Sequence, residues 1–313
     1  MYSVSGVIWY LSSRWVFMTH TLFAFARKVP RQRSINVWHG MPIKAVGTFL
    51  HGHDGTSTRG DVPFLDQFDL LVANDERYQK VLARAFALPE ERVVVCDSPR
   101  NGYLAPNASI KRELAVSGRL GVWLPTFRTR NVDVSSADAD QRPLAAGNVT
   151  QTSTIDFEAL NVVLRELDFS LLVKAHPSAV TEEPVQYSHI KTIDNEWLQA
   201  RDLSLYRLLG GSDLLITDIS SVYNDFKSCG GEVIVYMDDF EAYVKGRNLC
   251  FERFDDVVSN TVLGSQDQLC EVLRRVRVRV DPEASSDPSE RAVHANAHQL
   301  LDIVGCLPCE MNE

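Results

Sequence analysis

The sequence has 313 residues, of which 45% are hydrophobic, and its formal net charge is -9 at pH 7. A chain of this length is expected to form two domains of about 100 to 200 residues each. The acidic balance, together with the lack of a Lys or Arg run, excludes a broad surface for nucleic acids or anionic membranes, so any phosphate site must be local.

Neither the cysteines nor the histidine-rich loop predicts a metal site. The six cysteines are scattered, which favours a reducing compartment over a disulfide framework. Cys306 and Cys309 have the spacing of a redox or zinc motif, but there is no second pair of this kind. His51-Gly-His53-Asp54 lacks further ligands at a standard spacing, so we interpret it as a polar loop. Neither segment is therefore interpreted as a metal site.

The first 29 residues are apolar and aromatic, but Arg14 and His20 interrupt them. No uninterrupted run approaches the roughly 20 residues of a membrane span, and the basic start and cleavage site of a signal peptide are missing. These features predict a soluble protein.

In the first half of the chain, strands and helices alternate. Apolar runs predict a helix end before a strand at 15–18, and Ile35–Trp38 is a strand that leads into His39-Gly-Met-Pro42. Glycine and proline directly after a strand require a loop, which places His39 at the carboxyl edge of a sheet. The other elements expected here are a strand at 70–73, a helix at 75–87, a strand at 93–95 and a helix at 109–116.

The second half repeats this alternation after Gly118. It is expected to contain strands at 120–124, 171–174, 214–217 and 233–236, helices at 155–167, 203–209 and 266–276, an aperiodic loop at 129–154 and a closing helix at 289–304. Such alternation is typical of parallel, doubly wound sheets. We predict an α/β protein with an N-terminal domain at 1–117 and a C-terminal domain at 118–313.

The stretch from Asp213 to Phe226 predicts a strand, a tight turn and a helix. Ser220 and Ser221 stand where the helix should start, so a hydroxyl is expected to cap its first turn. The free N–H groups at such a helix start can bind the phosphates of a nucleotide. Asp218 and the serines could equally serve only as a cap.

Two histidines occupy matching places in the two halves. His39 and His176 each follow a strand and each precede a proline within three residues. Across a cleft, one neutral imidazole could take a proton from a hydroxyl, while the other, with Lys174 or Arg128, could stabilise phosphate charge. The sequence has no Walker A loop, GxGxxG turn, GxSxG elbow or HExxH helix, which disfavours kinases, Rossmann oxidoreductases and hydrolases.

Five segments together resemble the CDP-glycerol glycerophosphotransferase family, the teichoic acid and capsule polymerases. The resemblance runs from about Tyr10 to Leu301. The five segments are Val37-Trp-His-Gly-Met-Pro-Ile-Lys-Ala-Val-Gly47, Ser98-Pro-Arg-Asn101, Leu124-Pro-Thr-Phe-Arg128, Lys174-Ala-His-Pro177 and Leu215-Ile-Thr-Asp-Ile-Ser-Ser-Val-Tyr-Asn-Asp-Phe226.

The resemblance implies a GT-B fold, with two Rossmann-like domains facing a cleft, in a cytoplasmic protein at the inner face of a bacterial membrane. It also implies that no catalytic metal or other cofactor takes part. It implies transfer of a polyol phosphate from CDP-glycerol or CDP-ribitol to a hydroxyl of a lipid-linked or polymeric acceptor, with release of CMP. His39 matches the expected base and His176 the histidine that contacts the donor pyrophosphate. The matching substrate-binding positions are Gly40, Pro42, Lys44, Arg100, Asn101, Thr126, Arg128, Lys174, Thr217, Asp218, Ser220 and Ser221.

The chain departs from the family pattern in several places. Met41 stands where threonine is usual, Arg247-Asn248 replaces Arg-Gly, and Ser259-Asn-Thr261 replaces a Pro-Gly turn. Further strands normally precede the segment equivalent to residues 7–25, so we expect a truncated N-terminal domain. Two alternatives stay open: a GT-B glycosyltransferase that uses a sugar nucleotide, and a non-catalytic remnant that binds nucleotide or a partner. An oligomer or a peripheral membrane contact is also compatible with the sequence.

Overall fold

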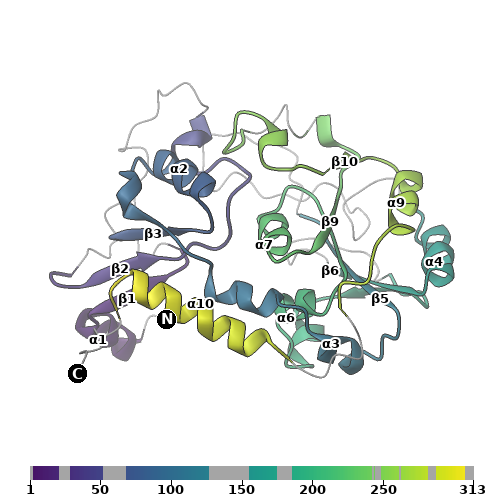
Figure 1. The fold of residues 1–313 in the computed structure, drawn as a ribbon, viewed down its shortest axis with the longest axis horizontal. Helices are drawn as coiled ribbons and strands as arrows, with labels where there is room; N and C mark the ends of the chain where they lie inside the picture. The colour runs from purple at the N-terminus through teal and green to yellow at the C-terminus, as the bar shows by residue number, and fades with distance from the viewer. Residues whose placement is uncertain are drawn as a thin grey trace.

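Two parallel β-sheets form the framework of the protein (Figure 1). The structure, a computed structural model, describes residues 3–20, 29–51, 68–126, 155–174, 185–241, 243, 248–260, 262–280 and 287–306. The predicted 129–154 loop, His53, Arg128, His176 and Cys309 lie outside the described residues. Each sheet has helices on both faces, which is the expected α/β architecture.

The first sheet has four parallel strands in the order β1-β2-β3-β4. They are β1 (Trp15–Met18), β2 (Arg33–Asn36), β3 (Leu70–Ala73) and β4 (Val93–Val95). Helix α2 (Glu76–Ala85) buries Tyr78 and Leu82 in the apolar cluster on one face. On the other face, Leu300 of helix α10 (Ser289–Ile303) packs with Ile35 and Val72.

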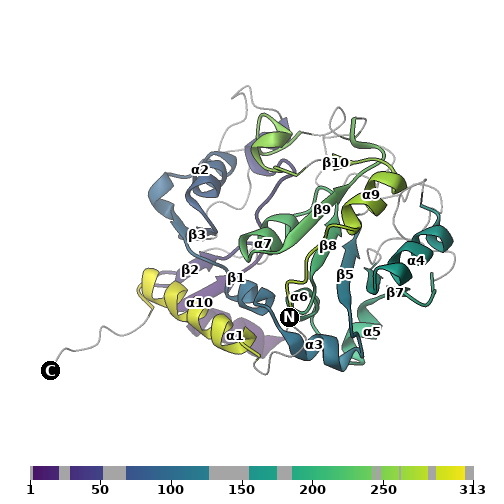
Figure 2. The same ribbon diagram turned by 45° about the vertical axis from the view of Figure 1, so that its right-hand side comes forward.

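The second sheet has six parallel strands in the order β10-β9-β8-β5-β6-β7. Its strands are β5 (Arg119–Leu124), β6 (Phe169–Lys174), β7 (Ile190–Ile193), β8 (Leu214–Thr217), β9 (Glu232–Tyr236) and β10 (Val262–Leu263). Helices α4 (Phe157–Glu166) and α9 (Gln266–Leu273) cover one face. Helices α6 (Leu205–Gly210) and α7 (Val222–Ser228) lie on the face turned toward the first sheet (Figure 2).

The remaining elements are short or peripheral. They are α1 (Val4–Ser12), η1 (Gly47–His51), η4 (Glu90–Arg92), η5 (Pro99–Leu104), α3 (Ala108–Glu113), α5 (Asn195–Gln199) and η6 (Phe254–Asp256). No helix among the described residues is long and apolar enough to cross a membrane.

Side-chain caps fix where several helices begin. Asp75 accepts a hydrogen bond from the Tyr78 N–H at 2.7 Å, so α2 starts directly after β3. Asp156, Asp194, Ser204 and Ser265 cap α4, α5, α6 and α9 in the same way. Each cap satisfies one of the N–H groups that a helix start leaves unpaired.

The two halves of the chain share one hydrophobic cluster. It contains Trp38 and Ile43 from the first half together with Val222 and Leu249 from the second. Helix α10 also returns from the second half and runs along η5, where the Asn296 side chain donates to the Ser98 carbonyl at 3.3 Å (Figure 1). The assignment of domain limits at 1–117 and 118–313 stays a prediction.

Three local expectations needed correction. The strand predicted at 35–38 ends at Asn36, because Trp38 adopts a positive φ of 52°. Strand β7 and helix α5 were not predicted, since Ile190–Ile193 is a short run interrupted by Lys and Thr. Strand β10, of two residues, was also missed.

A buried ion pair joins α3 to the second sheet. Lys111 Nζ lies 2.7 Å from Asp213 Oδ2, and the two side chains are 1% and 0% exposed. The same carboxylate accepts N–H bonds from Leu120 at 2.8 Å, Arg279 at 2.8 Å and Val280 at 2.9 Å. A charge at this depth is tolerated because every oxygen has a partner.

We expect Asp213→Asn to lower the free energy of unfolding by about 3 to 5 kcal/mol, because it leaves the Lys111 ammonium buried without a counter-charge. Urea denaturation followed by tryptophan fluorescence measures the change. The control is Arg275→Gln, which removes an exposed pair with Glu271 and should shift stability by no more than about 0.5 kcal/mol. Equal losses in the two variants would contradict the prediction.

Candidate active site

The loop after β2 has an unusual backbone. Trp38 and Gly40 have positive φ values of 52° and 133°, so the chain turns sharply as it leaves the sheet. Such a φ is costly for a bulky residue such as Trp38. Its backbone N–H donates to Asn36 Oδ1 at 2.8 Å, and its ring packs edge-on against Phe86 with centroids 4.9 Å apart. These contacts hold the strained turn, with exposed His39 at its tip.

This loop lies directly against the start of α7. A Cβ atom added at Gly40 would be 2.5 Å from Ser221 Oγ, so no side chain fits between the two segments. One residue on, the Met41 carbonyl accepts a hydrogen bond from the Asn224 amide at 3.5 Å. The His-Gly-x-Pro loop of the first half and the serine turn of the second half are therefore adjacent.

Arg100 joins the same two segments. Its guanidinium donates to the His39 carbonyl at 2.9 Å and to Asp225 Oδ2 of α7 at 2.9 Å. Tyr206 of α6 donates its hydroxyl to the same carboxylate oxygen at 2.6 Å, and its ring lies 4.8 Å from the guanidinium carbon. Burial raises the pKa of the Asp225 carboxyl, and the charge of Arg100 and hydrogen bonds from Tyr206, Arg100 and Asn101 oppose that rise.

The His39 ring is oriented by two neighbours. Its Nδ1 lies 3.2 Å from the Thr19 carbonyl, and its ring is stacked on His20 with centroids 4.2 Å apart and planes 7° from parallel. A carbonyl can only accept, so this contact places the proton of the neutral ring on Nδ1 and leaves the Nε2 lone pair available. Partial burial lowers the pKa of His39; the Thr19 bond opposes this, while His20 and Arg100 lower it further.

Residues at the ends of β5 and β8 bind one another. Thr126 donates to Asp218 Oδ2 through its N–H at 3.0 Å and its hydroxyl at 2.7 Å. Thr217 is buried and donates its hydroxyl to the Leu124 carbonyl at 2.9 Å. Thr126, Thr217 and Asp218, which are predicted substrate-binding residues, thus fix the carboxyl edge of the second sheet through these bonds.

The two serines do not cap α7, contrary to expectation. The N-cap residue Ser221 has helical dihedral angles and makes no side-chain capping bond. Its carbonyl and that of Ser220 instead accept backbone bonds from Asn224 and Tyr223, each at 3.1 Å. Both serines are half-buried, and in the described part of the chain neither hydroxyl has a hydrogen-bond partner.

The remaining predicted site residues are divided between the two edges. Lys174 is half-buried at the end of β6, where burial lowers the pKa of its ammonium and Asp194 opposes that effect. Pro42 is buried beside Gly40, and Lys44 forms an antiparallel bridge with Leu249. The positions of His176 and Arg128 are outside the described residues, so their roles stay predictions.

Three residues that contact this site are not among the predicted site residues. Asp225 belongs to the stretch from Asp213 to Phe226, but its pairing with Arg100 spans 125 residues of sequence. Tyr206 carries no motif at all. His20 was seen only as an interruption of an apolar run, although a second histidine near a predicted base was a usable signal.

Two sheets of this kind, meeting at a joint between their carboxyl edges, define a GT-B-like α/β protein. The structure is similar to that of the wall teichoic acid polymerase TagF, with a TM-score of 0.66, 19% identity, and 94% of this chain and 74% of that one covered. A UDP-N-acetylglucosamine 2-epimerase structure from Listeria monocytogenes matches with a TM-score of 0.53 at 12% identity, covering 97% of this chain and 78% of that one.

The chain belongs to the CDP-Glycerol:Poly(glycerophosphate) glycerophosphotransferase family, whose profile matches residues 1–295. It is similar to the teichoic acid poly(glycerol phosphate) polymerase of Bacillus spizizenii, at 21% identity over 86% of this chain and 68% of that protein. It is also similar to the teichoic acid ribitol-phosphate polymerase TarK of Staphylococcus aureus, at 28% identity over 81% of this chain and 48% of that protein. The protein is thus a transferase of the glycerophosphotransferase type.

We expect His20→Phe to raise the pKa of the His39 ring, because phenylalanine keeps the stacked face but cannot carry the charge that disfavours protonation of His39. Titration of labelled histidine side chains by NMR measures this pKa. The control is His298→Phe on the exposed face of α10, which should leave it unchanged. A His39 pKa that is equal or lower in His20→Phe would refute the proposed influence of His20.

Proposed function

We propose that the protein transfers glycerol phosphate or ribitol phosphate from its CDP ester to a hydroxyl of a lipid-linked or polymeric acceptor. Family membership supports the reaction class, and the contact between Gly40 and Ser221 supports the placement of the chemistry. That contact brings an exposed histidine of the first half to the edge of the second sheet, where the motifs predicted to bind the donor lie. We expect no metal or other cofactor in the reaction.

In this proposal His39 is the general base. Its Nε2 takes the proton of the acceptor hydroxyl as the hydroxyl oxygen attacks the β-phosphorus of the donor. A new phosphodiester bond forms, the bond between the β-phosphorus and the bridging oxygen breaks, and CMP leaves with the bond electrons. The lowered pKa of His39 keeps the ring neutral, which a base requires, near pH 7.

The donor is proposed to lie along the carboxyl edge of β5, β6 and β8. Lys174 and His176 would neutralise the pyrophosphate, and the half-buried hydroxyls of Ser220 and Ser221 would donate hydrogen bonds to it. The bonds from Thr126 to Asp218 hold this edge in place. Arg100 would act on the acceptor side by fixing the carbonyl of His39.

We expect His39→Ala to abolish release of CMP from CDP-glycerol or CDP-ribitol while donor binding survives, because the base is lost but the second-half site is intact. His176→Ala should weaken donor binding as well as turnover. Chromatographic detection of CMP and calorimetric titration of the donor measure the two effects, with a UDP-sugar as the control substrate. Normal turnover in either variant, or turnover of the UDP-sugar alone, would reject the assignment.

We further propose that the protein works at the inner face of a bacterial membrane through α1. This helix has no charged side chain, and its Val4, Ile8 and Trp9 are 79%, 59% and 73% exposed. An apolar helix surface with an aromatic residue is suited to the boundary between lipid headgroups and acyl chains. The net charge of -9 gives no attraction to anionic lipid, so binding would rest on apolar burial.

We expect Ile8→Glu to reduce co-sedimentation of the protein with phosphatidylglycerol-containing vesicles several-fold, because a carboxylate opposes insertion of the helix. The matched control is Val278→Glu, at a position 58% exposed outside α1, which should leave binding unchanged. Equal binding of wild type and Ile8→Glu would exclude this role. Loss of a dimer in Ile8→Glu, measured by light scattering, would instead identify α1 as a contact between two copies.

A further inference from the structure

A cavity lies along the second sheet between α3, β6 and β7, outside the candidate active site. Its volume is about 340 Å³, and it opens between the end of α3, the first residues of β6, and β7. It is lined by Ser170–Leu172 near the start of β6, whereas the active-site residue Lys174 ends the same strand. The proposed function makes no use of this cavity.

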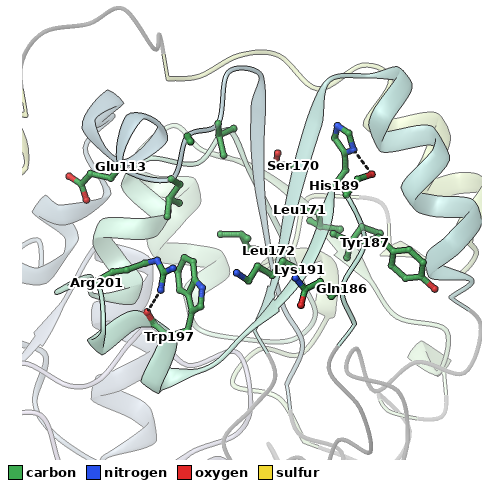
Figure 3. A pocket seen from close by; sticks show the side chains of 15 residues that line it. Glu113, Ser170, Leu171, Leu172, Gln186, Tyr187, His189, Lys191, Trp197 and Arg201 are labelled. Atoms are coloured by element: carbon green, nitrogen blue, oxygen red, sulfur yellow. Dashed lines mark hydrogen bonds between the residues drawn. The ribbon is translucent and has the colours of Figure 1, made fainter.

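Two cations share one indole ring in its wall (Figure 3). The guanidinium carbon of Arg201 lies 4.2 Å from the Trp197 ring centre, and Lys191 Nζ lies 5.7 Å from it. Arg201 also donates to the Trp197 carbonyl at 3.2 Å, which fixes one end of its side chain. Both positive groups thus lie against the same aromatic ring.

Among the residues that the structure describes, no carboxylate neutralises these two cations, Lys191 and Arg201. Glu113 also lines the cavity, but its carboxylate points away from both cations (Figure 3). Two like charges beside one ring repel each other, and a bound anion would relieve that repulsion. Because the chain as a whole has a net charge of -9, this positive pair is a local exception to its overall charge.

The other residues that line the cavity indicate which kind of anion fits it. Leu172 and the Trp197 ring offer apolar surface, and Ser170 and Gln186 offer polar groups. Arginine can bind two oxygens of one phosphate, while lysine acts as a point charge beside it. The volume is at the lower end of the range for small-ligand sites, roughly 300 to 1,000 Å³. A phosphodiester flanked by short polyol carbons fits these features better than a bare ion or a protein segment.

We propose that this cavity is a docking subsite for one phosphodiester of a polyol phosphate chain. The identity of the chain rests on the proposed function, in which such a polymer is the acceptor. Held here, an internal phosphate would keep the polymer attached between successive transfers while its terminal hydroxyl is at His39. The subsite would therefore govern chain retention and leave the chemical step unchanged.

Direct binding tests the subsite without turnover. A synthetic glycerol phosphate hexamer is titrated into the full chain, without donor, by calorimetry. Arg201→Gln and Lys191→Gln should each weaken hexamer binding about tenfold or more and reduce its salt dependence, since each removes one phosphate contact. The matched control Arg274→Gln, at an exposed arginine of the C-cap of α9, should bind as wild type does.

Two outcomes would overturn the proposal. One is unchanged hexamer affinity in both cavity variants, with their thermal midpoints confirming that they are folded. The other is displacement of the hexamer by inorganic phosphate or CDP-glycerol at equal concentration, which would make the cavity a site for single phosphates or for the donor. Trp197 fluorescence, isolated by comparison with Trp197→Phe, reports whether the ligand enters this cavity.

Product length gives an independent readout. With excess donor and a saturating acceptor too short to reach the cavity, Arg201→Gln should make shorter polymers than wild type while the initial rate of CMP release stays the same. Equal product lengths would argue against a role in retention. If the wild-type chain releases no CMP at all, the proposed function fails, whereas the hexamer titration still decides whether the cavity binds a polyol phosphate chain.

Discussion

The geometry of the candidate site depends on the ion pair between Arg100 and Asp225. Asp225 is 3% exposed, so its charge must be compensated inside the protein, and Arg100 and Tyr206 are the partners that do so. Because the same guanidinium holds the His39 carbonyl, the position of the proposed base is tied to α7. One buried carboxylate thus places a loop of the first half against a helix of the second.

A second set of contacts makes this joint rigid. The backbone of residues 43–45 pairs with that of residues 248–250 through bonds of 3.0 Å from Ala45 N and 2.9 Å from Cys250 N. Asn224 of α7 donates to the Tyr78 hydroxyl at 2.6 Å, which connects α7 to α2. Burial raises the pKa of Tyr78, so its hydroxyl stays protonated. The segment that follows the His39 loop and the helix against which the loop packs, α7, are therefore both held in place.

The parts of the fold that rest on local pattern could be predicted from the sequence, and those that rest on distant pairing could not. Buried runs such as Leu214–Thr217 and capping residues such as Asp75 are local signals, and the elements appear where they indicate. The Ser221 hydroxyl failed as a cap because a tight turn that includes Ser220 begins the helix through carbonyl groups. Side-chain identity alone cannot distinguish these two arrangements.

The same limit applies to the site. The motifs placed His39 and Ser221 at sheet edges, but their adjacency depends on Gly40 approaching within van der Waals distance, which only the fold determines. The resemblance marked Arg100 without showing that Asp225, 125 residues away, is its partner. Interactions across the joint carry no periodic signal in the sequence, so the partners of known motif residues were the part left unpredicted.

The pairing of Arg100 also bears on how an acidic protein handles an anionic polymer. Asp225 already neutralises this arginine, and a paired guanidinium attracts phosphate less than a free one. Its contact with the His39 carbonyl favours a positioning role over direct substrate binding. In the proposed docking subsite, attraction of the polymer falls to cations without a carboxylate partner among the described residues, namely Lys191 and Arg201. Separating orientation of the base from attraction of the chain lets both occur in a protein whose overall charge repels its substrate.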